Sequence, residues 1–71
     1  MNPEQLEKIV VDYLLEGMSQ QEIASALKET GHKPSSLSYV EKLIKELKAK
    51  HNAKSMFHLG AIITLKRYLK S

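Results

Sequence analysis

The chain has 71 residues, no cysteine and a net charge of +3, with eleven lysine and arginine residues against eight acidic ones. This length allows one domain, over residues 1–71, with a small core, and the lack of cysteine excludes disulfides and zinc–thiolate sites. No apolar run exceeds three residues, which excludes a membrane-spanning helix, and the polar, acidic start MNPEQLEK is unlike a signal peptide.

Charge is distributed unevenly along the chain. Residues 1–29 contain six acidic and two basic residues, whereas residues 30–71 contain two acidic and nine basic residues. The net charges of the two parts are therefore −4 and +7. A basic C-terminal half beside an acidic N-terminal half indicates an oriented partner such as nucleic acid.

Four helices are predicted, over about residues 3–16, 19–29, 36–51 and 55–69. In the first, Asn2 is the expected cap, Pro3 takes the first helical position, and Gly17 ends the helix. The apolar residues that recur at helical spacing are Leu6, Ile9, Val10, Tyr13 and Leu14. Val11 and Leu15 lie outside this stripe, so each needs a second neighbour or stays partly exposed.

The second helix has the spacing of a capping box, in which Ser19 and Glu22 each satisfy a free backbone N–H. Its expected buried residues are Ile23, Ala24 and Leu27. Gly31 and Pro34 then interrupt the helical pattern.

The third helix has two distinct faces. Its apolar stripe consists of Leu37, Val40, Leu43, Ile44 and Leu47, and the opposite side carries Ser38, Lys42, Lys45 and Ala49. Ser36 is the expected cap, although Ser38 with Glu41 offers a competing capping box. Asn52 suits a left-handed position after the last turn. A helix of this kind suits either an anionic partner or an ordinary solvated surface.

The fourth helix, capped by Ser55, is apolar on more than one side. One stripe holds Leu59, Ala61, Ile62, Leu65 and Leu69, while Met56 and Ile63 face away from it. Such a helix either forms a dimer interface or inserts deeply into the fold. No alternation typical of strands occurs in the sequence, so the predicted class is all-α.

The run LLEGMSQQEIA at residues 14–24 resembles the "LL-x-G-(L/M)-S-x-x-E-I-A" run of LuxR-type (GerE-like) DNA-binding domains. Residues 40–53 are similar to the recognition helix of that family and the turn after it, with Val40, Ile44 and Leu47 at its apolar positions and Lys50 at a frequent basic one. The resemblance covers roughly residues 6–66.

The resemblance implies a four-helix bundle that contains a helix-turn-helix and lacks winged elements. It implies a bacterial, cytoplasmic transcription regulator, or the DNA-binding domain of one, that acts at the nucleoid and reads the major groove of double-stranded DNA with residues 36–51. The residues it assigns to DNA contact are Ser19, Gln20, Ser38, Tyr39, Glu41, Lys42, Lys45 and Lys54. It also implies a homodimer through the C-terminal helix, for which the expected interface residues are Met56, Leu59, Ile63 and Arg67.

The sequence departs from the family pattern in three ways. Of these, Glu41 and the enlarged turn, together with the acidic first half of the chain, favour an alternative, a protein-interaction module of the same fold that has lost DNA binding. Glu41 stands where the family commonly has lysine, and Leu43 and His51 also replace common residues. Eight residues separate Leu27 from Ser36, far more than is usual, so the turn over residues 28–35 is enlarged. Residues 28–35 either lengthen the second helix or form a loop.

Catalytic and ligand-binding chemistry has no clear signature in the chain. No nucleophile–base pair and no glycine-rich phosphate loop is visible, and no two histidines share a helix face at metal-ligand spacing. An enzyme, a metal site, a cofactor and a small-molecule site are therefore not expected.

Overall fold

The computed structural model describes residues 3–70. Its elements are α1 (Pro3–Leu15), α2 (Gln20–Glu29), α3 (Leu37–His51) and α4 (Met56–Lys70), with no strand in this part of the chain. The prediction of an all-α chain with four helices is confirmed, and each helix begins and ends within one residue of its predicted bounds. The predicted cap Asn2 lies outside the described residues.

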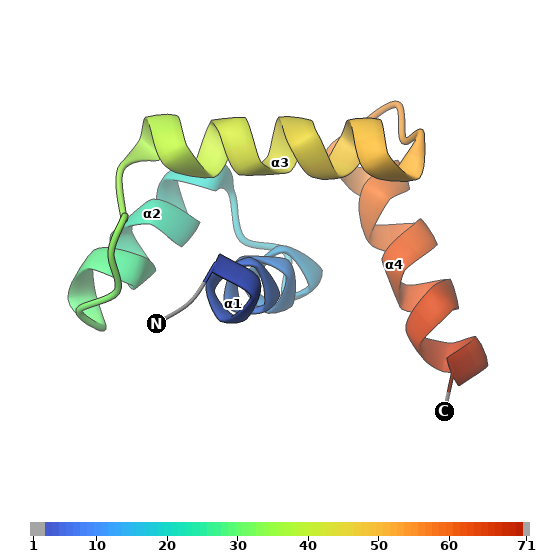
Figure 1. The fold of residues 1–71 in the computed structure, drawn as a ribbon, viewed down its shortest axis with the longest axis horizontal. Coiled ribbons are helices and arrows are strands. Elements are labelled where there is room, and N and C mark those ends of the chain that lie inside the picture. Colours follow the sequence, from blue (N-terminus) through green and yellow to red (C-terminus); the bar gives the residue numbers. More distant parts are fainter. Residues whose placement is uncertain (1–2, 71) are drawn as a thin grey trace.

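The α3 helix spans one side of the molecule, and the other three helices lie on the other side of it (Figure 1). Both α2 and α4 pack against α3 and against α1. The turn into α4 lies at one end of α3 and the connection from α2 at the other (Figure 1). As a result, no other helix covers the outer face of α3.

The helix ends follow local rules that the sequence predicts. The reciprocal Ser19–Glu22 capping box is present, and Ser36 rather than Ser38 caps α3, accepting a hydrogen bond from the Tyr39 N–H. Asn52 adopts the left-handed conformation with φ 55°. The enlarged turn is mostly a loop, because α2 ends at Glu29 and residues 30–36 connect it to α3.

The core is built only from apolar side chains, contributed by all four helices. Its buried members are Leu6, Val10, Val11, Leu14, Ile23, Ala24, Leu27, Val40, Ile44, Leu47, Leu59 and Ile63, and no polar or charged residue among those described is buried. The predicted buried residues of α2 are confirmed. Val11 lies off the main apolar stripe of α1 but is also buried. It lines a pocket together with Ile63 of α4.

The predicted division of α4 into faces is wrong. Leu59 and Ile63, expected on different sides, both point into the core, whereas Leu65 and Leu69 are 58% and 73% exposed and Ala61 is exposed as well. The inward stripe, spaced at three and four residues, is Met56, Leu59, Gly60, Ile63 and Arg67.

Two contacts with α1 accompany this orientation. Gly60 faces Leu15, whose Cδ2 would lie at an ordinary van der Waals distance, 3.7 Å, from a Cβ at that position. Farther along the same stripe, the Arg67 guanidinium donates to the Asp12 carboxylate at 2.9 Å. The side of α4 that faces α1 thus carries a small residue and an ion pair as well as apolar residues.

Within the described chain, no helix has both the length and the apolar character needed to cross a bilayer.

Candidate nucleic-acid interface

The outer face of α3 is polar and predominantly basic. Glu41, Lys42 and Lys45 are exposed on it, and Lys48 is partly exposed. Behind them, Val40, Ile44 and Leu47 are buried at 0–3% exposure. The buried stripe fixes α3 on the core, so the charged residues are held on a rigid helix with their side chains in solvent.

A groove runs between this face and the first turn of α2. It has a volume of about 480 Å³ and is lined by Gln20, Glu41, Lys42, Ile44, Lys45 and Lys48. Four residues predicted to contact DNA therefore meet in one groove, although they come from two helices. The packing of α2 against α3 brings Gln20 to the lysines.

The capping box holds the α2 end of the groove. The Ser19 hydroxyl accepts from the Glu22 N–H at 3.2 Å, and the Ser19 N–H donates to the Glu22 carboxylate at 2.9 Å. Hydrogen bonding of the Glu22 carboxylate by Ser19, with its backbone N–H foremost and its hydroxyl next, holds the pKa of Glu22 below its ordinary value. The Gln20 amide contacts the Met56 sulfur at 3.5 Å, so its position is fixed by α4.

Glu41 makes no ion pair and no side-chain hydrogen bond with the described residues. The predicted competing capping box from Ser38 does not form, because Ser36 is the cap. Nor does Glu41 pair with Lys45 one turn later, although that spacing permits it. The carboxylate is therefore free in a groove that three lysines also line.

Besides Ser19, which caps α2 beside the groove, three predicted residues do not line it. Tyr39 is partly buried and lines a small hollow with Lys42, Leu43 and Glu46. Burial raises the pKa of Tyr39, and the negative charges of Glu7 and Glu46 raise it further. Ser38 is exposed in the first turn of α3, and Lys54 follows the last turn, so the predicted residues span about 20 Å of helix.

Lys48 belongs to the groove but is absent from the predicted contact residues. Its spacing of three residues from Lys45 and seven from Glu41 places all three on one side of α3. This periodicity is visible in the sequence and could have identified Lys48. The participation of Gln20 with these residues depends on the packing of two helices, which periodicity within one helix does not report.

A second exposed surface lies on α4 and is apolar. Phe57, Leu65 and Tyr68 are 88%, 58% and 77% exposed, and they border a hollow of about 650 Å³ between α4 and the C-terminal end of α1. We call these three residues the outer α4 face. They do not coincide with the predicted dimer residues: Leu59 and Ile63 are buried in the core, Arg67 binds Asp12, and only Met56 reaches the hollow.

Metal-binding geometry is absent from residues 3–70, where no group of three histidine, cysteine or acidic side chains could hold an ion. Comparison of the chain with protein-family models, curated proteins and solved structures found no match at the significance required.

Proposed function

We propose that this protein binds double-stranded DNA and regulates transcription, with α2 and α3 acting as a helix-turn-helix. The observation that carries the proposal is the groove in which Gln20 of α2 meets Lys42, Lys45 and Lys48 on the uncovered face of α3. The resemblance of residues 14–24 to LuxR-type domains supports the same function.

The shape of α3 fits the major groove of DNA. An α-helix with its side chains is about 10–12 Å across, and the major groove is about 12 Å wide. A helix that enters this groove must have a face free of other elements, and the outer face of α3 meets that condition (Figure 1). The exposed residues of α3 would then reach base edges while α1, α2 and α4 stay outside.

Phosphate contacts would supply most of the affinity. Lys42, Lys45 and Lys48 have no acidic partner within 4 Å among the described residues, so a phosphate would not have to displace one. The first turn of α2 lies next to the groove, but its capping box uses the Glu22 N–H and places the Glu22 carboxylate at this helix end. The phosphate contacts are therefore assigned to the lysines.

We further propose that two copies associate through the outer α4 face. Three large apolar side chains exposed together on one helix are unusual on a monomer of this size and are typical of a contact surface. A dimer would place two α3 helices on one DNA molecule, which suits two half-sites.

The DNA proposal is tested by fluorescence anisotropy with a labelled random-sequence duplex at several salt concentrations. The wild-type affinity should fall steeply as salt rises, because each phosphate that is neutralised adds about 0.9 to the slope of log K against log salt. In the double variant Lys42→Gln with Lys45→Gln, the affinity should drop. The slope should also decrease by about 0.9 for each phosphate that the variant no longer neutralises.

The matched control is Lys66→Gln with Lys70→Gln, which removes the same charge from α4, away from the outer face of α3. Its affinity and salt slope should stay close to those of the wild type. Equal decreases in both double variants would mean that only net charge matters. Binding that is absent, or that ignores salt, would reject the DNA proposal in favour of a protein-interaction module.

A further inference from the structure

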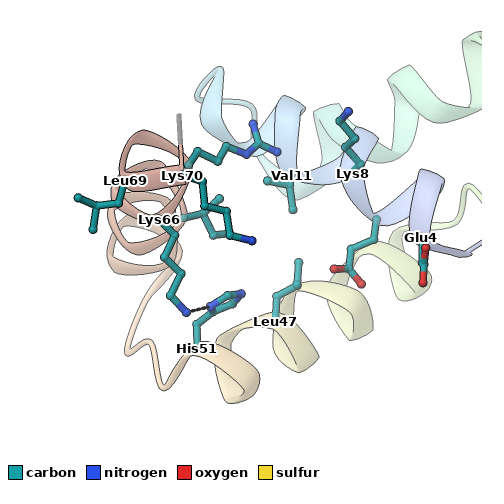
Figure 2. Close-up of a pocket in the computed structure, with 11 residues that line it drawn as sticks. Glu4, Lys8, Val11, Leu47, His51, Lys66, Leu69 and Lys70 are labelled. Atoms are coloured by element: carbon teal, nitrogen blue, oxygen red, sulfur yellow. Dashed lines mark hydrogen bonds between the residues drawn. The ribbon is translucent and has the colours of Figure 1, made fainter.

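A separate pocket lies between α1, the C-terminal end of α3 and the C-terminal half of α4 (Figure 2). Its volume is about 490 Å³, which is within the range of small-molecule sites. It lies away from the groove of α2 and α3 and shares no lining residue with it. We call it the α1–α4 pocket.

The pocket exists because α1 and α4 are held together at one level and are separated beyond it. Val11 of α1 and Ile63 of α4 are both buried and line the pocket. The Arg67–Asp12 ion pair joins the same two helices. Toward the start of α1, the lining residues Glu4 and Glu7 leave an open space opposite the last turn of α4. The helices therefore enclose a hollow instead of packing along their whole length.

The floor of the pocket is apolar and rigid. Val11, Leu47 and Ile63 contribute to it from three different helices, and each is at most 7% exposed. Leu69 extends the apolar surface at the outer edge, where it is 73% exposed. A hydrocarbon chain laid over this floor would remove apolar surface from water on both partners.

Cationic groups border the α4 side. Lys66 and Lys70 line it, and neither has an acidic partner within 4 Å among the described residues. The Lys66 ammonium contacts Nδ1 of His51 at 3.0 Å (Figure 2). Burial, followed by the charges of Lys66 and Lys50, lowers the pKa of His51. Because an ammonium group can only donate, Nδ1 accepts in this contact, and no acidic side chain among the described residues pairs with Lys66.

The α1 side has the opposite charge. Glu4 and Glu7 line it, with Lys8 beside them, so negative groups lie across the pocket from the two α4 lysines. A ligand with a single anionic group would be oriented by this arrangement. Its anion would face Lys66 and Lys70, and its uncharged part would point along the floor toward α1.

We propose that the α1–α4 pocket binds a small amphipathic monoanion, namely a medium-chain aliphatic carboxylate, with its head group at Lys66 and Lys70 and its chain over Val11, Leu47 and Ile63. The proposal is independent of DNA binding. It assigns a ligand to a part of the molecule that neither the groove nor the outer α4 face uses.

The test is a titration of the ¹⁵N-labelled full chain with sodium octanoate, followed by amide chemical shifts. Saturable shifts should centre on Val11, Leu47 and His51. Decanoate should bind up to about 15-fold more tightly than octanoate, because each buried methylene contributes about fourfold. Octan-1-ol, which lacks the charge, should bind about five- to tenfold more weakly.

The double variant Lys66→Gln with Lys70→Gln should lose affinity for octanoate by a similar factor but keep its affinity for octan-1-ol. The matched control is Lys42→Gln with Lys45→Gln, which should bind octanoate as the wild type does. The spectrum of each variant reports whether its fold is intact. Shifts that centre on Phe57 and Tyr68, equal affinity for the alcohol, no effect of the α4 variant, or no saturable binding would each overturn the proposal.

Discussion

Glu41 is the residue on which sequence recognition would depend in this protein. Its carboxylate has no cation within 4 Å and no hydrogen-bond donor among residues 3–70, yet it lines the same groove as three lysines. Beside a phosphate it would be repelled. In the major groove a carboxylate can instead accept a hydrogen bond from the N4 amino group of cytosine. An acid at this position therefore lowers general affinity for DNA while it can favour one base.

We expect Glu41→Gln to bind random duplex more tightly than the wild type, because one repulsive charge is removed. The same variant should lose a preference for cytosine worth about 1–3 kcal/mol at one position of the bound site. Selection from a randomised duplex pool followed by anisotropy measures both effects. Glu46→Gln is the control, since Glu46 is exposed on α3 but lines a different hollow. An identical selected sequence for wild type and Glu41→Gln would contradict the role of Glu41, although it would leave DNA binding intact.

Among the elements, α2 has the most completely defined start. The capping box joins Ser19 and Glu22 by two hydrogen bonds, and the one from the Ser19 N–H to the Glu22 carboxylate favours the charged form of that carboxylate. Because its pKa is lower in the folded chain than its ordinary value of 4.5, the box stabilises the fold fully above that value. The stabilisation is lost as pH falls through the lower, folded-state pKa.

We therefore expect the stability advantage of the wild type over Glu22→Gln to be constant near neutral pH and to disappear in acid. Urea unfolding followed by circular dichroism between pH 7 and pH 3 would measure it. Glu16→Gln removes one negative charge just before the box and controls for the general effect of charge. An advantage that grows as pH falls would contradict the assignment, because it has the opposite sign.

The elements also show which features the sequence could predict. Ser19 with Glu22, Gly31 and Asn52 are local signals, and all four act as predicted because a helix end is decided by its nearest residues. The orientation of α4 was not predictable in this way. Its apolar residues allow more than one inward stripe, and the choice depends on residues of other helices, such as Asp12 of α1, which pairs with Arg67.

The candidate sites likewise contain some residues that the sequence could predict and others that only the packing of helices brings together. Lys42 and Lys45 are recognisable from their spacing on one helix, whereas Gln20 joins them only after α2 and α3 pack. The α1–α4 pocket needs residues from three helices, and its floor residue Val11 lies off the main stripe of α1. A pattern within one helix predicts the exposed face of that helix, but it does not predict which residues a neighbouring helix contributes to the same site.

For the whole molecule, the outer α4 face predicts concentration-dependent association. Tyr68→Glu should weaken the dimer at least about tenfold, since it places a charge among Phe57 and Leu65, which would be buried together. Sedimentation equilibrium over a range of protein concentrations measures this.

Leu37→Glu is the control for Tyr68→Glu. It places the same charge at an exposed leucine of α3, 36% exposed and outside the outer α4 face. Leu37→Glu should therefore leave the dimer largely intact. A wild-type chain that stays monomeric at every concentration, or a stronger effect of Leu37→Glu, would contradict association through this face.

The entirely apolar core has a practical consequence for all of these measurements. No ionisable group among the described residues is buried, so added salt has no buried ion pair to weaken and acts mainly on side chains at the surface. Ionic strength can therefore be varied to separate DNA binding from folding. Temperature has the complementary effect, because the free energy of apolar burial weakens on cooling while charge pairing at the surface does not depend on that burial. Salt and temperature together give two nearly independent experimental controls, one over what the protein binds and the other over how firmly it is folded.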